Sequence, residues 1–303
     1  MADLAVEIGP LRLRNPVLTA SGTCGYGLDL LPFVAPEQLG GVCTKGLSLL
    51  PRAGNPPPLI WETPCGMLNA IGLANIGVEA FVADKVPPLR DRGVTVIANV
   101  LGFTTEEFGE LARRLDGIDG LAALELNLSC PNVSHGGVHI GRDPRLAAAA
   151  VAAARAATRL PLLAKLSPEG EPVAVARAVA DAGADAVSVC NTLRAMAIDI
   201  ESRRPRLAAG YGGMSGPALH AIAVRLVHEI SRAVPLPVVG VGGVTTWQDA
   251  VEMMLAGATA VQVGTAVLVE PEAPLMVLEG LERYLDGRGE SARDIVGAVL
   301  PAE

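Results

Sequence analysis

Eight short apolar segments recur along the chain, and they constrain the fold more than any other feature of the sequence. They are almost continuously apolar, as strands covered on both faces should be, and lie at residues 17–20, 41–44, 94–100, 122–127, 162–166, 186–190, 238–240 and 260–264. Stretches with helical periodicity separate several of them, at residues 105–115, 172–182, 217–234 and 246–256. The alternation predicts parallel βα units. Eight such units that close on themselves predict an α/β fold of the TIM (β/α)8 barrel type, as one domain over residues 1–303.

An open doubly wound sheet is the alternative fold. It would normally show a GxGxxG fingerprint after its first strand, and the sequence SGTCGYG at residues 21–27 does not have that spacing. Two long segments rich in Pro, Gly or polar residues, 49–75 and 192–213, follow strand ends and lack helical periodicity. We expect both to form extra elements over the C-terminal mouth of the barrel, where barrel enzymes build their active sites.

Composition and charge narrow the classes of function. The net charge of −8 at pH 7 argues against a nucleic-acid-binding surface. No apolar run reaches the roughly 18 residues that a membrane helix needs, and the first residues lack the pattern of a signal peptide. The five cysteines show no CxxC spacing, so neither a zinc site nor an iron–sulfur cluster is predicted. We expect a cytoplasmic protein without a metal site.

Glycine-rich runs follow the last two predicted strands. Gly242 and Gly243 come after the seventh strand, and Gly264 and Thr265 come after the eighth. Loops at these positions of a barrel commonly bind phosphate, because glycine lets several backbone N–H groups approach the anion closely. Gly216, in the run GGMSGP, would add a further N–H. The alternative is that these glycines only form tight turns; two runs at these two strand ends favour a phosphate-bearing ligand.

Polar residues also stand at the ends of apolar strands. They include two of the only three lysines, and are Lys45, Asn69, Asn99, Asn127, Lys165, Asn191 and Thr192. Each asparagine alone could be a turn residue or a satisfied core amide. A lysine inside an apolar strand is harder to place without a ligand, because an unpaired buried charge is costly. Together these residues predict a polar site for a flat heterocycle at the barrel mouth.

Cys130 follows the fourth predicted strand, on a loop that contains Pro131 and the pair Gly136-Gly137. A thiol on a mobile mouth loop can serve as a general base if its surroundings lower its pKa. Burial without function is the usual fate of a cysteine. We expect the cysteines that lie within strands or outlying loops to be buried without a catalytic role. We expect Cys130 to take part in the reaction.

Three segments resemble class 1 dihydroorotate dehydrogenases: TPCGMLNAIGL at 63–73, NLSCPNV at 127–133 and GGMSGP at 212–217. The resemblance extends over nearly the whole chain, and the second segment is the most specific. Members of that family are FMN-containing TIM barrels of pyrimidine biosynthesis that oxidise dihydroorotate to orotate. Cys65 stands where the family has a serine, and no role is expected for it.

The resemblance implies a role for each matching residue. FMN would be held by Ser21, Lys45, Gly46, Asn99, Asn127, Lys165, Cys190, Gly216, Gly242, Gly243, Gly264 and Thr265. The pyrimidine would be held by Lys45, Asn69, Ala70, Ile71, Gly72, Leu73, Asn127, Asn191 and Thr192. Cys130 would remove the proton at C5 while hydride leaves C6 for the flavin. Lys45 would neutralise charge that develops during the reaction, and Lys165 would stabilise the reduced flavin.

The loop at residues 133–138, VSHGGV, resembles the NAD-linked two-subunit type. That type implies a partner subunit with FAD and a [2Fe–2S] centre, bound to a homodimer of this chain in a heterotetramer. The alternatives are a fumarate-linked homodimer of class 1, another FMN barrel such as a tRNA dihydrouridine synthase, and a non-catalytic phosphate-binding barrel. The acidic charge opposes the dihydrouridine synthase, and a binding barrel would not explain Cys130 together with two strand-end lysines.

Overall fold

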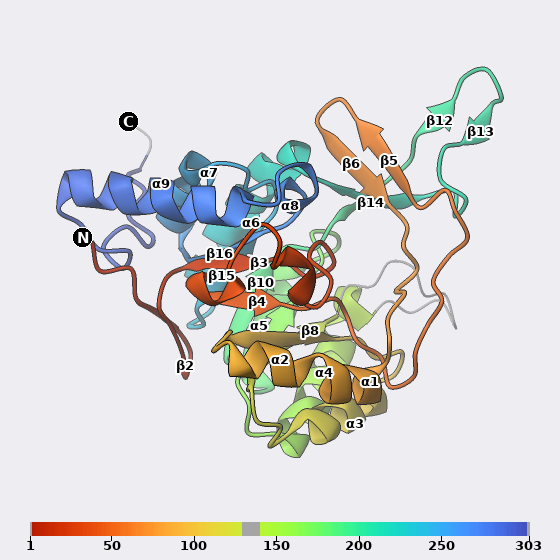
Figure 1. Cartoon of the computed structure of the whole chain (residues 1–303), viewed down its shortest axis with the longest axis horizontal. Helices are drawn as coiled ribbons and strands as arrows, with labels where there is room; N and C mark the ends of the chain where they lie inside the picture. Colours follow the sequence, from red (N-terminus) through yellow and green to blue (C-terminus); the bar gives the residue numbers. More distant parts are fainter. Residues whose placement is uncertain (1, 129–139, 302–303) are drawn as a thin grey trace.

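Eight parallel strands close into a barrel in the computed structural model, which describes residues 2–128 and 140–301 (Figure 1). Each barrel strand pairs with the barrel strands that precede and follow it in the chain, and the last barrel strand pairs with the first. The strands are β3 (Val17–Thr19), β4 (Gly41–Cys43), β7 (Val96–Val100), β8 (Leu121–Asn127), β9 (Leu162–Lys165), β10 (Ala186–Val189), β15 (Val238–Val241) and β16 (Ala258–Val263). The predicted TIM barrel and its eight strands are confirmed.

Helices surround the barrel and bury their apolar faces against it (Figure 1). They are α1 (Val78–Asp84), α2 (Val86–Asp91), α3 (Thr105–Leu115), α4 (Pro144–Ala157), α5 (Pro172–Asp181), α6 (His220–Ala233), α7 (Trp247–Ala256), α8 (Ala266–Val269) and α9 (Ala273–Arg288). Short 3-10 turns are η1 (Leu28–Leu30), η2 (Pro36–Gln38), η3 (Ile140–Arg142) and η4 (Pro217–Leu219). Helix α7 begins with a capping box between Thr246 and Asp249, which satisfies backbone N–H groups at the start of the helix.

A second, antiparallel sheet stands away from the barrel at the upper right of Figure 1. It has the order β11 (Leu193–Ala195), β14 (Gly212–Ser215), β6 (Gly66–Asn69), β5 (Ile60–Thr63). A small hairpin of β12 (Ile198–Asp199) and β13 (Arg204–Pro205) extends it. These strands lie in the segments 49–75 and 192–213, except that β14 runs on to Ser215, and residues of the sheet line the same cavity as the ends of the barrel strands, so the expected position over the mouth is confirmed. Their strand structure was not predicted, because they are short, contain glycine and lack a regular apolar alternation.

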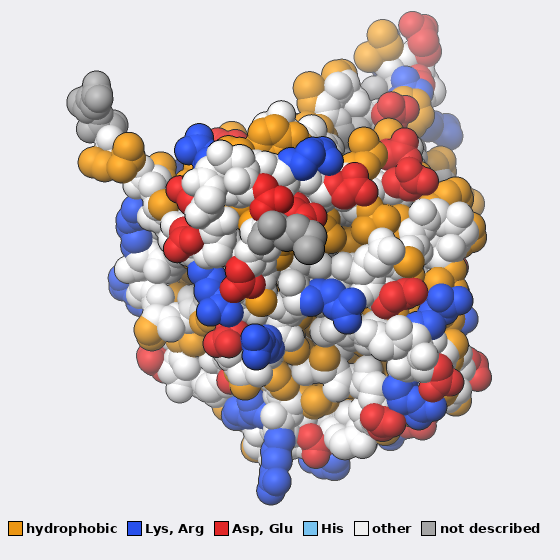
Figure 2. Space-filling view, turned by 60° about the vertical axis from the view of Figure 1, so that its left-hand side comes forward, with side chains coloured by type: hydrophobic (Ala, Val, Ile, Leu, Met, Phe, Trp, Pro, Cys, Tyr) orange, Lys and Arg blue, Asp and Glu red, His pale blue; other side chains and the backbone are white. Residues whose placement is uncertain are grey.

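The amino end of the barrel is covered by a hairpin of β1 (Val6–Ile8) and β2 (Leu11–Leu13). Its turn residue Gly9 lies against Asp185, just before β10. No helix among the described residues is long and apolar enough to cross a membrane. Acidic and basic side chains are interspersed on the face drawn in Figure 2. The organisation of residues 1–303 as one domain stays a prediction.

Candidate functional site

A cavity of about 290 Å³ opens at the carboxyl ends of the barrel strands, at the lower end of the sizes usual for small-molecule sites. Its wall includes residues at or just beyond the ends of the strands, such as Ser21 after β3, Lys45 after β4 and Lys165 at the end of β9. The antiparallel sheet contributes Asn69 and Gly213 from above. The two long segments therefore complete a site that the barrel begins.

Nearly all residues predicted to bind the cofactor or the pyrimidine line this one cavity. They are Ser21, Lys45, Gly46, Asn69, Ile71, Gly72, Leu73, Asn127, Lys165, Cys190, Asn191, Thr192, Gly216, Gly242, Gly243, Gly264 and Thr265. Ala70 is buried instead in a small apolar cluster with Leu68 and Leu207. Asn99 is fully buried within the barrel, and Cys130 lies outside the described residues. The roles assigned to these residues stay predictions.

Backbone geometry explains why glycine follows β15. Gly242 and Gly243 have φ angles of 134° and 69°, which side-chain-bearing residues rarely adopt. A Cβ atom on Gly243 would lie 2.6 Å from the Cβ of His220 and 2.9 Å from the carbonyl oxygen of Gly216. The loop after β15 thus packs tightly against the start of α6 and against Gly216. Gly216, Gly242 and Gly243 therefore lie together on one side of the cavity, where glycine lets backbone N–H groups approach an anion closely.

The side chain of His220 forms a hydrogen bond with this loop. Its Nδ1 lies 3.2 Å from the carbonyl oxygen of Gly242, and its Nε2 lies 3.0 Å from Oε2 of Glu252. A carbonyl oxygen only accepts hydrogen bonds, so Nδ1 must donate here. His220 therefore fixes the orientation of the Gly242 peptide at the edge of the cavity.

The amide side chains are oriented by contacts among themselves and with the backbone. Asn191 donates from Nδ2 to Oδ1 of Asn127 at 3.2 Å, so the ends of β8 and β10 are linked across the cavity. Asn69 donates to the carbonyl oxygen of Gly213 at 3.2 Å and joins β6 to β14. Asparagine carries both a donor group and an acceptor. Amides held in this way can recognise the alternating N–H and C=O groups of a flat heterocycle.

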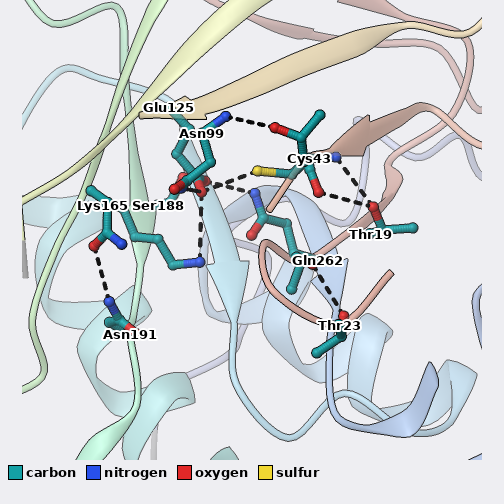
Figure 3. A network of polar contacts seen from close by, with 12 residues as sticks. Thr19, Thr23, Cys43, Asn99, Glu125, Lys165, Ser188, Asn191 and Gln262 are labelled. Carbon is teal, nitrogen blue, oxygen red and sulfur yellow. Dashed lines mark hydrogen bonds and ion pairs between the residues drawn. The ribbon is translucent and has the colours of Figure 1, made fainter. Parts of the chain in front are cut away.

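A buried carboxylate lies beneath the cavity, at the centre of the polar network in Figure 3. Glu125 of β8 is fully buried, and its Oε1 lies 3.6 Å from Nζ of Lys165. It also accepts four hydrogen bonds from four different strands: from Cys43 at 3.1 Å, Asn99 at 2.7 Å, Ser188 at 2.7 Å and Gln262 at 2.8 Å. Burial alone would raise the pKa of Glu125, but the Lys165 ammonium and these donors outweigh burial and lower it. The carboxylate is therefore ionised.

The buried cysteines are held as neutral thiols. Burial raises the pKa of Cys190 to about 12 and that of Cys24 to about 11. Burial, followed by the negative charge of Glu125, raises the pKa of Cys43 well above its ordinary value. None of these three thiols would provide a thiolate near neutral pH.

Glu125 is the main residue of this region that the sequence analysis did not single out. A signal was available, because Glu125 is a charged residue inside an apolar strand, as Lys165 is. The expectation that Lys165 needs a ligand to balance its charge was incomplete, since Glu125 is its counter-ion. Ser215, which accepts a hydrogen bond from Thr265 at 2.8 Å, also lines the cavity; it lies in the segment GGMSGP, but no role was predicted for it.

Comparison with known proteins agrees with the resemblance found in the sequence. The family model described as dihydroorotate dehydrogenase matches residues 3–285. The chain is 55% identical over 298 residues to the "Dihydroorotate dehydrogenase B (NAD(+)), catalytic subunit" of Trichlorobacter lovleyi, with 98% of each chain covered. Proteins of the same name from Pelobacter propionicus and Geobacter sulfurreducens are each 54% identical, again with 98% of both chains covered. The chain therefore belongs to the dihydroorotate dehydrogenase family.

Proposed function

We propose that this chain is the catalytic subunit of an NAD-linked dihydroorotate dehydrogenase, which oxidises dihydroorotate to orotate in pyrimidine biosynthesis with FMN as its cofactor. The observation that carries the proposal is the cavity at the barrel mouth, which gathers two of the three lysines, three asparagines and the glycine loops. The names of relatives that are 54–55% identical over almost their whole length support the NAD-linked type. A phosphate-binding barrel without catalysis would not require this set of lysines and amides.

The residues of the cavity fit FMN. Gly216, Gly242, Gly243 and Gly264 line the cavity together and suit a phosphate group, because glycine lets backbone N–H groups approach the anion closely. Asn99 has a buried Oδ1 with no hydrogen-bond partner among the described residues. This oxygen lies beside Gly46 of the cavity wall, whose Cβ, if it had one, would be 2.9 Å away. A buried acceptor without a partner is costly, and a donor on the bound cofactor would satisfy it.

The chain's own residues would orient the substrate and move its protons. Bound FMN would supply the acceptor for the hydride that leaves C6 of dihydroorotate. Asn69, Asn127 and Asn191 would hold the pyrimidine in plane, and alignment of this kind contributes much of an enzyme's rate. Lys45 lines the cavity and would neutralise negative charge that develops on the substrate. Cys130, three residues after Asn127 in the sequence, would take the proton from C5.

Lys165→Ala should lose FMN or lower its reduction potential, whereas Lys85→Ala should change neither. Lys165 lines the cavity and is 5% exposed, while Lys85 lies outside the barrel at the junction of α1 and α2. A hydrogen bond to a charged group contributes about 1.5–3 kcal/mol, so FMN affinity should fall about tenfold or more. The measurement is the flavin content and the reduction potential of bound FMN in the parent protein, Lys165→Ala and Lys85→Ala. Equal values in all three would contradict the role of Lys165.

His220→Ala should weaken FMN binding by about five- to tenfold. The Gly242 carbonyl would lose a hydrogen bond worth about 1 kcal/mol, and the loop after β15 would be less well held. His228→Ala is the matched control, since His228 lies on the same helix and contacts Arg232 at the surface. Titration of the FMN-free proteins with FMN gives the affinities. An unchanged affinity for His220→Ala would exclude this role.

The partner arrangement belongs to the same proposal. A subunit with FAD and a [2Fe–2S] centre would pass electrons from this chain to NAD, with a homodimer of this chain at the core of a heterotetramer. The names of the relatives, each a catalytic subunit, support the existence of a partner. A cytoplasmic location stays a prediction.

The visible spectrum of the purified chain tests the proposal. A yellow protein that releases FMN on denaturation is expected. A colourless protein that does not bind added FMN would instead favour a barrel that only binds phosphate.

A further inference from the structure

Two lysines reach the cavity, and they differ in their electrostatic surroundings. Lys165 has Glu125 as counter-ion, with 3.6 Å between Nζ and Oε1. Lys45 has no ion-pair partner within the part of the chain that the structure describes. Lys165 lines the cavity, whereas Glu125 is fully buried and does not. The carboxylate thus reaches the cavity only through its neighbours, and Figure 3 shows the Lys165 ammonium beside it.

The charge of this buried pair sums to zero. A buried lysine without a counter-ion would present its full positive charge to whatever lies in the cavity, because the protein interior screens charges weakly. The negative charge of Glu125 offsets the positive charge of Lys165. Its four other contacts are all donors, from Cys43, Asn99, Ser188 and Gln262, which hold the carboxylate in its ionised form and in one position.

The same carboxylate orients Asn99. An ionised carboxylate only accepts hydrogen bonds, so Asn99 must direct its Nδ2 toward Glu125, at 2.7 Å. The Oδ1 of Asn99 then faces away from Glu125, beside Gly46 of the cavity wall. One buried residue therefore determines both a charge and a hydrogen-bonding group beneath the cavity.

We propose that Glu125 is a positioning residue for the reaction: it offsets the charge of Lys165 and so sets how strongly the site favours reduced over oxidised FMN. The proposal depends on the proposed function, since it requires FMN in the cavity. Glu125 touches neither cofactor nor substrate and acts through Lys165 and Asn99. Removing its charge should make bound FMN easier to reduce, and removing the charge of Lys165 should make it harder to reduce.

The test is a charge-balance cycle on the FMN-loaded protein. The variants are Glu125→Gln, which is nearly isosteric, Lys165→Met, and the double variant. The reduction potential of bound FMN is measured against reference dyes at one fixed pH. We expect Glu125→Gln to favour the reduced form about tenfold more than the parent, which is ~30 mV for a two-electron couple. Lys165→Met should shift the potential in the opposite direction, and the double variant should return toward the parent.

Ser188→Ala is the matched control. It removes one hydrogen bond to the same carboxylate but no charge, so the potential should stay at the parent value. An unchanged or lower potential in Glu125→Gln, or an equal shift in Ser188→Ala, would overturn the proposal. If a single variant does not fold, the reduction potential of the double variant is compared with that of the parent. The double variant is expected to fold, because replacing both members of a buried ion pair destabilises a protein much less than removing one of them. A change of more than about tenfold in the preference of the double variant for reduced over oxidised FMN would then contradict the proposal.

Failure of this inference differs from failure of the proposed function. A parent protein that binds no FMN would contradict the proposed function. A parent that binds FMN and is reduced by dihydroorotate, with potentials insensitive to Glu125, would contradict only the role of Glu125.

Discussion

Cys130→Ala is expected to slow the reduction of bound flavin by dihydroorotate at least ~10²-fold, the lower end of the loss expected for a missing general base. Binding of FMN should be retained, because the glycine loops and Lys165 are unchanged. The measurement is rapid anaerobic mixing of the variant with dihydroorotate. Cys65→Ala is the matched control, because Cys65 is exposed and has no assigned role. A Cys130→Ala protein that reduces its flavin at the parental rate would exclude Cys130 as the base.

The same rate should rise with pH in the parent protein. The thiolate is the basic form of cysteine, so the rate increases as the thiol ionises, around the ordinary pKa of ~8.5 or somewhat below. The buried thiols cannot produce this rise, since burial raises the pKa of Cys24 to about 11 and that of Cys190 to about 12. This rise of the rate of flavin reduction with pH should be absent in Cys130→Ala. A pH profile that is flat in the parent would argue against a cysteine base.

The isolated chain is expected to reduce its flavin with dihydroorotate but not to turn over with NAD. Its sequence contains neither a GxGxxG dinucleotide fingerprint nor a closely spaced cysteine cluster. Cofactors carry redox chemistry that side chains do not supply, so electrons should leave through a partner subunit with FAD and a [2Fe–2S] centre. Adding that subunit should establish NAD reduction.

Steady-state assays of the pure chain distinguish this arrangement from the fumarate-linked type. The control is the chain with dihydroorotate and fumarate in place of NAD, without a partner. Rapid turnover with fumarate and no response to the partner subunit would show that the chain belongs to the other subclass.

The barrel was predictable because each of its strands is covered on both faces. Strands such as β7 and β16 are therefore almost continuously apolar, and the helices between them have clear periodicity. The antiparallel sheet over the mouth has no comparable pattern. In β14, Gly212 and Gly213 give no side-chain alternation, and the strand is formed by long-range pairing of Gly213 with Asn69 of β6.

The individual site residues were partly predictable for a similar reason. Polar residues at strand ends stand out against apolar strands, and this identified Lys45, Lys165 and Asn127. The network below the cavity depends on register between strands, which one sequence does not reveal. Asn99 lies opposite Glu125 in the pairing of β7 with β8, and Ser188 lies opposite Lys165 in the pairing of β10 with β9. Only the folded barrel shows that Lys165 has a counter-ion.

Anaerobic mixing of the FMN-loaded chain with dihydroorotate tests the central claim most directly. The absorbance of the flavin and the amount of orotate are followed together after mixing. We expect the flavin absorbance to bleach, with about one orotate formed per flavin as the two-electron stoichiometry requires. A flavin that stays oxidised in the presence of excess dihydroorotate, although it is reduced by a chemical reductant, would contradict the account.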